Sequence, residues 1–261
     1  MLELHHWEPN TYYLKPLIAL KEKQAPFTSR YFDATRFEQF APGFPRNIES
    51  SLHLEREGPV LVHDGTIVSS SFFMLEYIAD ALPGTDLYPG NAYEHYRARA
   101  FGQFLTLQLG PGVCALGCAK YLAPVLGKRD PKQLEAQIAA IEPLERRAAW
   151  SAVIDGTYDE ARLATLKQRL GFPVGRLEST LAKGPWLNGA SYSVADIEAF
   201  SLLNALPDLA PEIVNERATP RISEFLNRMR ERRAVREALA LSKTGKPQQA
   251  FVPGSEPSRW G

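Results

Sequence analysis

The sequence predicts a small mixed α/β domain followed by a larger all-helical domain. Alternating and helical patterns mix before residue 83, whereas almost everything after residue 92 has helical period. Two Pro-Gly pairs, at 83–84 and 89–90, separate the two parts. We therefore expect an α/β domain at 1–83, a linker at 84–91, a helical domain at 92–242 and a tail at 243–261.

Composition and charge limit the classes of protein to which the chain can belong. The chain has 261 residues, 44% of them hydrophobic, and its 30 basic and 30 acidic residues cancel, which disfavours a nucleic-acid partner. No apolar run reaches the roughly 18 to 20 residues of a membrane span, and MLELHHWEP is not a signal peptide. We expect a cytoplasmic protein that binds neither membrane nor metal, with Cys114 and Cys118 as small buried residues on one helix face.

The first domain reads as strand, helix, strand, broken helical region, hairpin and helix. Period-2 and helical patterns predict these elements, and the order suggests a small mixed sheet covered by helices. The segments are strands at 2–7 and 27–32, a helix at 14–23, weaker helical stretches at 37–44 and 50–57, and a hairpin that starts at 60–62.

The hairpin and the helix after it form the most informative segment. Asp64-Gly65 between two apolar runs predicts a tight turn in which both residues have positive φ. Ser70 or Ser71 then caps a helix with one apolar face. A helix N-terminus beside a Gly58-Pro59 strand entrance is a place where backbone N–H groups can meet an anionic ligand.

The helical domain contains six or more amphipathic segments. A Gly-Pro-Gly break at 110–112 divides the first two, and Pro173 interrupts or kinks the long one. The tail is expected to be an arm on the surface or at an interface. The predicted helices are 92–108, 113–125, 133–141, 145–154, 159–181, 194–206 and a basic-faced terminal helix at 220–241.

This layout resembles the glutathione transferase superfamily. Gly58-Pro59 stands where these proteins have a residue followed by a cis-proline, and Tyr192 to Asp196 (YSVAD) has the form of their S/T-x-x-D capping box. YYLKPLIALKEK at 12–23, FEQF at 37–40, VHDG at 62–65 and an insertion at 132–172 resemble the bacterial lignin β-etherases. The resemblance implies a thioredoxin-like, glutathione-binding domain followed by an all-α bundle.

The resemblance also implies a glutathione site. Gly58, before Pro59, would offer main-chain hydrogen bonds to the cysteinyl part, and residues 70 and 71 would grip the γ-glutamyl group. The family has an acid followed by serine there, whereas this chain has Ser70-Ser71. Loss of the acid that faces the ammonium removes about 1.5 to 3 kcal/mol, which corresponds to about tenfold to a hundredfold in affinity.

The group that activates the thiol also departs from the family pattern. By register with the β-etherases, Tyr12 and Tyr13 replace an Asn and a Ser, and Thr11 is the smaller candidate donor. Two interpretations remain open. Either a hydroxyl of Thr11, Tyr12 or Tyr13 serves the thiol, or both tyrosines fill the space that glutathione would occupy.

The function implied by the resemblance is glutathione-dependent cleavage of β-aryl ether bonds in lignin-derived aromatics. The small aromatic ether would be the substrate and glutathione the co-substrate, in a homodimer or a heterodimer with a related chain. Two alternatives remain. One is a non-catalytic partner subunit with a degenerate glutathione site, and the other is a ligand-binding protein of the same fold.

Overall fold

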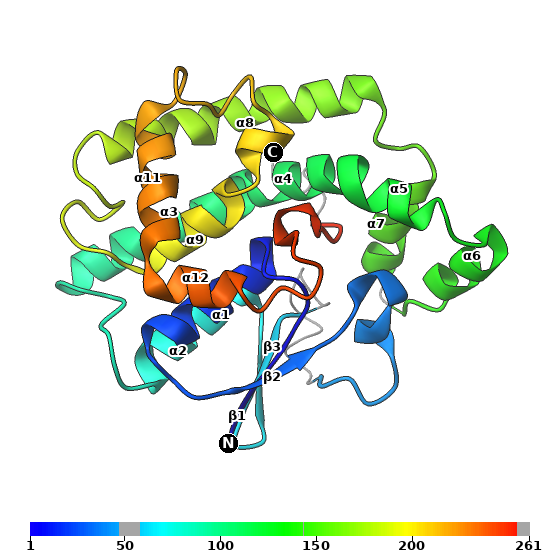
Figure 1. The fold of residues 1–261 in the computed structure, drawn as a ribbon, viewed down its shortest axis with the longest axis horizontal. Coiled ribbons are helices and arrows are strands. Elements are labelled where there is room, and N and C mark those ends of the chain that lie inside the picture. Colours follow the sequence, from blue (N-terminus) through cyan, green and yellow to red (C-terminus); the bar gives the residue numbers. More distant parts are fainter. Residues whose placement is uncertain (47–57, 143, 255–261) are drawn as a thin grey trace.

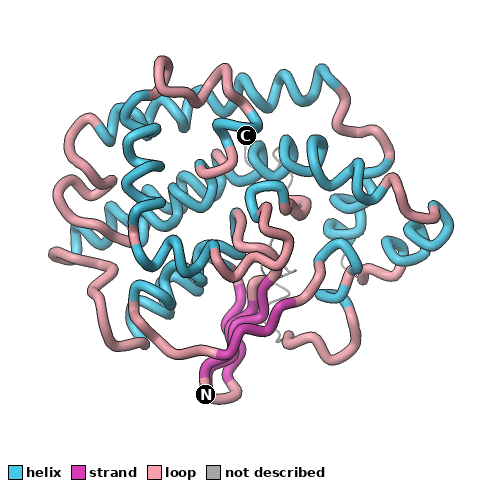
Figure 2. Tube along the Cα trace, in the orientation of Figure 1, coloured by secondary structure: helices cyan, strands magenta, loops and turns pink. Residues whose placement is uncertain are grey.

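The computed structural model describes residues 1–46, 58–142 and 144–254. Its one sheet lies at one end of the molecule, and helices fill the rest (Figures 1 and 2). The strand order is β2-β1-β3-β4, with β1 and β2 parallel and the other pairs antiparallel. The strands are β1 (Leu2–His6), β2 (Thr28–Tyr31), β3 (Val60–His63) and β4 (Thr66–Ser69).

The N-terminal elements follow the predicted order. Helix α1 (Thr11–Glu22) comes after β1, two 3-10 turns at Ala34–Arg36 and Glu38–Phe40 occupy the region predicted as weakly helical, and α2 (Ser71–Ala81) follows the hairpin. Asp64 and Gly65 both have positive φ, 48° and 82°, which confirms the predicted turn. The predicted helical stretch at 50–57 lies outside the described residues.

The rest of the chain is helical. The helices are α3 (Ala92–Gln108), α4 (Gly110–Gly117), α5 (Ala123–Leu126), α6 (Pro131–Ala139), α7 (Leu144–Ile154), α8 (Glu160–Leu181), α9 (Val194–Leu203), α10 (Leu206–Leu209), α11 (Pro220–Glu231) and α12 (Arg233–Leu239), with a π-helical turn at Cys118–Leu122 and a 3-10 turn at Pro247–Gln249.

Helix α1 lies at the centre of the molecule and joins its two parts. It packs against α2 on the sheet side and against α9 and α12 on the helical side (Figure 1). Leu14, Leu17 and Ile18, the predicted apolar face, are fully buried. Burial on both sides explains why even Lys15 is enclosed. The helix starts at Thr11, three residues before the predicted start, so all three candidate thiol donors lie in its first turn.

Three helix predictions need correction. Helix α8 runs without interruption through Pro173. The predicted terminal helix at 220–241 divides at Arg232, whose ψ of 133° ends the helical path. Arg232 is also not part of the predicted basic face, because its guanidinium donates to Glu22 at 2.7 and 3.0 Å and lies 3.6 Å from the centre of the Tyr192 ring.

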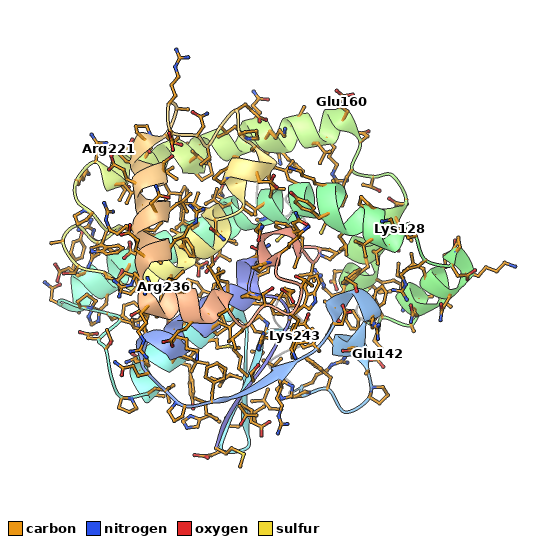
Figure 3. All side chains as sticks on the ribbon, viewed as in Figure 1. Lys128, Glu142, Glu160, Arg221, Arg236 and Lys243 are labelled. Carbon is orange, nitrogen blue, oxygen red and sulfur yellow. The ribbon has the colours of Figure 1, made fainter. Side chains whose placement is uncertain are left out.

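One helical stretch, Ala92–Leu126, is long and apolar enough to be a candidate membrane span by length and composition. Only one residue separates α3, which ends at Gln108, from α4, which begins at Gly110, so α3 to α5 continue as one stretch. The sequence predicts two shorter helices there. Within the molecule 67% of its apolar window is buried, as in the core helix of a soluble protein. Charged side chains of both signs, such as Lys128, Glu160 and Arg221, project around the outline (Figure 3).

Candidate functional site

The first turn of α1 has an unusual backbone. Thr11 is 1% exposed and has φ of +42°, a conformation that is costly for a β-branched residue. Asn10 occupies the N-cap position, but its side chain makes no capping bond. Instead its Nδ2 donates to the carbonyl of Ala250, 2.8 Å away, and its buried Oδ1 has no hydrogen-bond partner. The turn therefore depends on the C-terminal segment rather than on its own cap.

Tyr13 points toward the sheet. Its side chain is 1% exposed, and its ring makes edge contacts with Trp7 and Phe32 at centroid distances of 6.3 and 5.8 Å. A Cβ added to Gly58 would lie 3.5 Å from this ring. The Tyr13 ring thus packs directly beside the backbone that the resemblance assigns to glutathione.

Tyr12 points the other way, into the helical domain. Its hydroxyl lies so close to the start of α4 that a Cβ at Gly110 would be 2.7 Å from it. The ammonium of Lys15 stands 4.9 Å from the centre of its ring. The structure therefore separates the three candidate donors: Tyr13 faces Gly58, Tyr12 faces α4, and Thr11 lies at the turn before them.

The Gly58-Pro59 peptide is cis, as the resemblance implies. Gly58 has φ of +97°, which favours glycine at this position. Pro59 is buried, and β3 begins at the next residue. The Gly58 backbone therefore lies beside the Tyr13 ring, just before β3 begins.

Ser70 and Ser71 stand at the start of α2. Ser70 is the N-cap residue with φ of +68°, and its carbonyl accepts from the Met74 N–H at 2.8 Å. Its side chain makes no capping hydrogen bond, which corrects the prediction that it caps the helix. Ser71 is fully buried in the first turn. The helix N-terminus is oriented for an anion, and the residue before Ser71 carries no charge.

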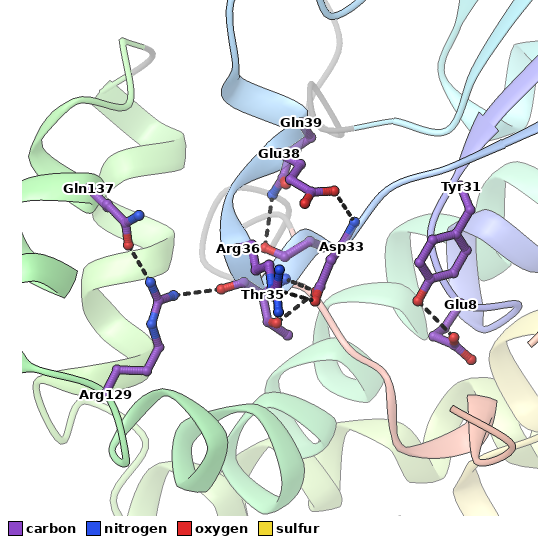
Figure 4. A network of polar contacts seen from close by, with 10 residues as sticks. Glu8, Tyr31, Asp33, Thr35, Arg36, Glu38, Gln39, Arg129 and Gln137 are labelled. Carbon is purple, nitrogen blue, oxygen red and sulfur yellow. Dashed lines mark hydrogen bonds and ion pairs between the residues drawn. The ribbon is translucent and has the colours of Figure 1, made fainter. Parts of the chain in front are cut away.

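The insertion at 132–172, together with Arg129 just before it, contacts the loop after β2. Arg129 donates to the Thr35 carbonyl at 2.6 Å and also to Gln137 of α6 (Figure 4). Its guanidinium lies 5.5 Å from the centre of the Phe37 ring, which in turn contacts Trp150 of α7 at 4.8 Å. Trp150 of the insertion and the preceding Arg129 thereby both contact Phe37 in the loop after β2, a set that sequence reasoning missed.

A buried ion pair beneath Tyr12 was also missed. Lys15 Nζ donates to Glu198 Oε1 at 2.6 Å, and both side chains are almost completely buried. Thr106 also donates to this carboxylate. The pair joins α1, α3 and α9, and a separation of 183 residues gives no local sequence signal. Lys15 holds one side of the Tyr12 ring through this pair and its cation–π contact.

The capping box of α9 is present as predicted. Asp196 accepts from the Ser193 N–H at 2.8 Å and from the Leu187 N–H at 2.9 Å. Burial nevertheless raises the pKa of the Asp196 carboxyl to about 7, against these hydrogen bonds, which lower it. Cys114 and Cys118 are buried without a disulfide, and no cluster of metal-ligating side chains occurs in the described part of the chain.

Comparison with known proteins agrees with this geometry. Residues 147–241 match the family model described as glutathione S-transferase, C-terminal domain. Protein LigF of Sphingobium sp. strain SYK-6 is 28% identical over 248 residues, which cover 93% of this chain and 94% of LigF. The crystal structure of β-etherase LigF superposes with a TM-score of 0.84 at 27% identity, over 92% of this chain and 99% of that one.

More distant structures share the fold. A glutathione transferase from Burkholderia graminis, solved with two glutathione molecules per subunit, has a TM-score of 0.68 at 23% identity and covers 94% of this chain and 89% of its own. The chain therefore has the glutathione transferase fold, with a thioredoxin-like domain and a helical domain that matches the family model, and it resembles the bacterial β-etherase LigF.

Proposed function

We propose that this protein is a cytoplasmic glutathione transferase-type enzyme that cleaves β-aryl ether bonds of lignin-derived aromatics, as one subunit of a dimer. The observation that carries the proposal is the full-length similarity to a β-etherase, combined with a cis Gly58-Pro59 peptide beside the first turn of α1. The start of α2 offers backbone N–H groups to a carboxylate.

In the proposed reaction the glutathione thiolate attacks the carbon that bears the aryloxy group. The C–S bond forms while the C–O bond breaks, and its electron pair leaves with the phenolate, which takes a proton to become the phenol. The thiol must lose its proton first, so a nearby hydroxyl that donates to the sulfur favours the reaction. Thr11 is the proposed donor, because the Tyr12 hydroxyl points toward Gly110 and Gly254, away from Gly58, and the Tyr13 ring packs among aromatic rings.

A second candidate is a non-catalytic partner subunit with a degenerate glutathione site. It is favoured by the ring of Tyr13 against Gly58 and by the neutral Ser70 where the family has an acid. In that case a related chain would contribute the chemistry, and this chain would contribute the interface. The two candidates differ in one measurable property, the affinity of the isolated chain for glutathione.

Calorimetric titration of the isolated chain with glutathione tests the proposal. The enzyme requires binding in the micromolar to low millimolar range and phenol release from a β-aryl ether. Ser70→Glu should tighten glutathione binding about tenfold or more, because it restores a charge-assisted hydrogen bond to the ammonium. Ser179→Glu is the matched control, since it adds the same charge at an exposed position of α8.

The partner-subunit candidate predicts a different pattern. Neither the wild-type chain nor Ser70→Glu would then bind glutathione, and ether cleavage would appear only after mixing with a related chain. That pattern would exclude the enzyme proposal.

A further inference from the structure

The C-terminal segment is anchored at its root by a buried carboxylate. Glu8 accepts from the N–H groups of Lys243 and Thr244 at 2.8 and 3.1 Å, from the Tyr31 hydroxyl at 2.9 Å, and from the Ser242 hydroxyl. Burial raises the pKa of Glu8, but these hydrogen bonds outweigh it and hold that pKa below its ordinary value. The root of the segment is thereby joined to the residues between β1 and α1.

The middle of the segment inserts into the helical domain. Phe251 is 1% exposed, and a Cβ at Gly117 would lie 2.2 Å from its ring, so α4 has a glycine where Phe251 sits. The ring stacks on Tyr121 with an interplanar angle of 7°. Figure 1 shows this segment in red at the centre of the view, between the start of α1 and α4.

The end of the described segment is held by Arg146 of α7. This arginine is 4% exposed and donates to the carbonyls of Pro253 at 2.6 Å and Gly254 at 3.2 Å. On the other side of Gly254, an added Cβ would lie 3.5 Å from the Tyr12 hydroxyl. The segment at 250–254 therefore lies between the Arg146 guanidinium and the first turn of α1.

The strained backbone of this turn explains why the contact matters. Positive φ at Thr11 persists only where the surroundings impose it. The N-cap side chain of Asn10 does not stabilise α1, since it donates to the segment at Ala250. Removal of the segment would leave a strained turn without the hydrogen bond from Asn10 to Ala250 and would uncover the Tyr12 hydroxyl.

We propose that Arg146 is a positioning residue, which clamps the 250–254 segment against Asn10 and Tyr12 and so fixes the first turn of α1, where the aromatic substrate of the proposed reaction would meet the thiol. The kinetic part of this inference rests on the proposed function. The structural part does not rest on the proposed function. It says only that Arg146, which lies outside the first turn of α1, controls the conformation of that turn.

Arg146→Ala and Arg146→Lys test the clamp. Lysine keeps the charge but lacks the planar fork that holds two carbonyls at once. Both variants should show faster amide hydrogen exchange at 250–254 and 10–14. The matched control is Arg228→Ala, which removes another guanidinium that donates to a carbonyl, that of Pro185 at 2.7 Å. Unchanged exchange in both segments in the Arg146 variants would overturn the inference.

Kinetics then separate positioning from a general loss of stability. A clamp predicts that KM for the ether rises about tenfold and that the pH profile of kcat/KM shifts, while the Kd for glutathione changes little. Lower thermal stability with unchanged KM and pH profile would overturn positioning. If the wild-type chain cleaves no ether, the proposed function fails, and the exchange comparison alone decides the inference.

Discussion

Tyr13 is the residue whose ring packs beside the Gly58 backbone. It is buried among Trp7 and Phe32, and these edge contacts contribute to stability beyond the buried area alone. The same ring stands 3.5 Å from the position of a Cβ on Gly58, and we expect it to compete with a ligand for the space beside this backbone. We therefore expect the Tyr13 ring to raise the free energy of unfolding and to lower the affinity for a ligand at the Gly58 backbone.

Replacement of Tyr13 should change the two properties in opposite directions. Tyr13→Ser should lower the free energy of unfolding by about 3 to 5 kcal/mol, the range for loss of a buried aromatic ring, and should tighten glutathione binding. Tyr13→Phe keeps the ring and should leave the Kd for glutathione unchanged. Urea denaturation and calorimetry measure the two effects. A Tyr13→Ser protein that loses stability with no gain in glutathione affinity would contradict the role of the ring in access.

At the scale of elements, contacts between helices far apart in sequence decide the arrangement around α1. Lys15 of α1 pairs with Glu198 of α9, and Thr106 of α3 donates to the same carboxylate. The second oxygen of Glu198 is buried without a hydrogen-bond partner. A buried pair of this kind costs desolvation of both ions, so removal of one partner is far worse than removal of both.

A double-mutant cycle at this pair tests whether an unpaired buried charge is what lowers the stability of the single variants. Glu198→Gln should lower the free energy of unfolding by about 3 to 5 kcal/mol, because it leaves the Lys15 charge buried and unpaired. The double variant Lys15→Met with Glu198→Leu should recover most of that loss. Glu237→Gln, which breaks the exposed i,i+4 pair with Arg233, is the control and should change little. If the single and the double variants lose the same free energy of unfolding, the unpaired charge of Lys15 is not the cause of the loss.

The free energy of unfolding should depend on pH through Asp196, the buried carboxyl of the α9 capping box. The pKa of Asp196 rises from 3.8 to about 7 on folding, so the native state binds the proton more tightly than the unfolded state. The contribution of Asp196 is therefore complete below about pH 4 and is lost as the pH rises through about 7. In Asp196→Asn that part of the pH dependence should disappear from denaturation midpoints. A profile between pH 4 and 7 identical to wild type would contradict the raised pKa.

Local patterns predicted the elements well, because periodicity and turn residues act within a few positions. The apolar face of α1, the Asp64-Gly65 turn and the α9 box depend only on nearby residues. The division of the terminal helix at Arg232 could not be predicted, since its partner Glu22 is 210 residues away. The cis peptide at Gly58-Pro59 was predicted only through the resemblance to glutathione transferases. The role proposed for Arg146 depends on the path of the C-terminal segment, which no local pattern in the sequence predicts.

At the scale of the whole molecule, a groove lined by aromatic and basic side chains lies on the outside of the helical domain. It has a volume of about 710 Å³ between α3 and α8. Tyr96 and Phe172 line it and are 63% and 64% exposed, and Tyr93 stacks on Tyr96 at 6.1 Å. Large exposed aromatic surfaces of this kind mark association sites. In the dimer proposed above, we expect this groove to lie at the interface between the subunits.

Charge introduced into the groove should therefore separate the subunits. Tyr96→Arg with Phe172→Arg adds two cations to a groove already lined by Arg97, Arg176 and Lys183, and burial of like charges opposes association. Sedimentation should show a dimer for the wild type and a monomer for the variant, with unchanged circular dichroism. Leu144→Arg is the control, because Leu144 is 71% exposed on α7, outside the groove. A variant that still sediments as a dimer would place the interface elsewhere. A wild-type monomer that associates only with a related chain, through this same face, would identify the assembly as a heterodimer.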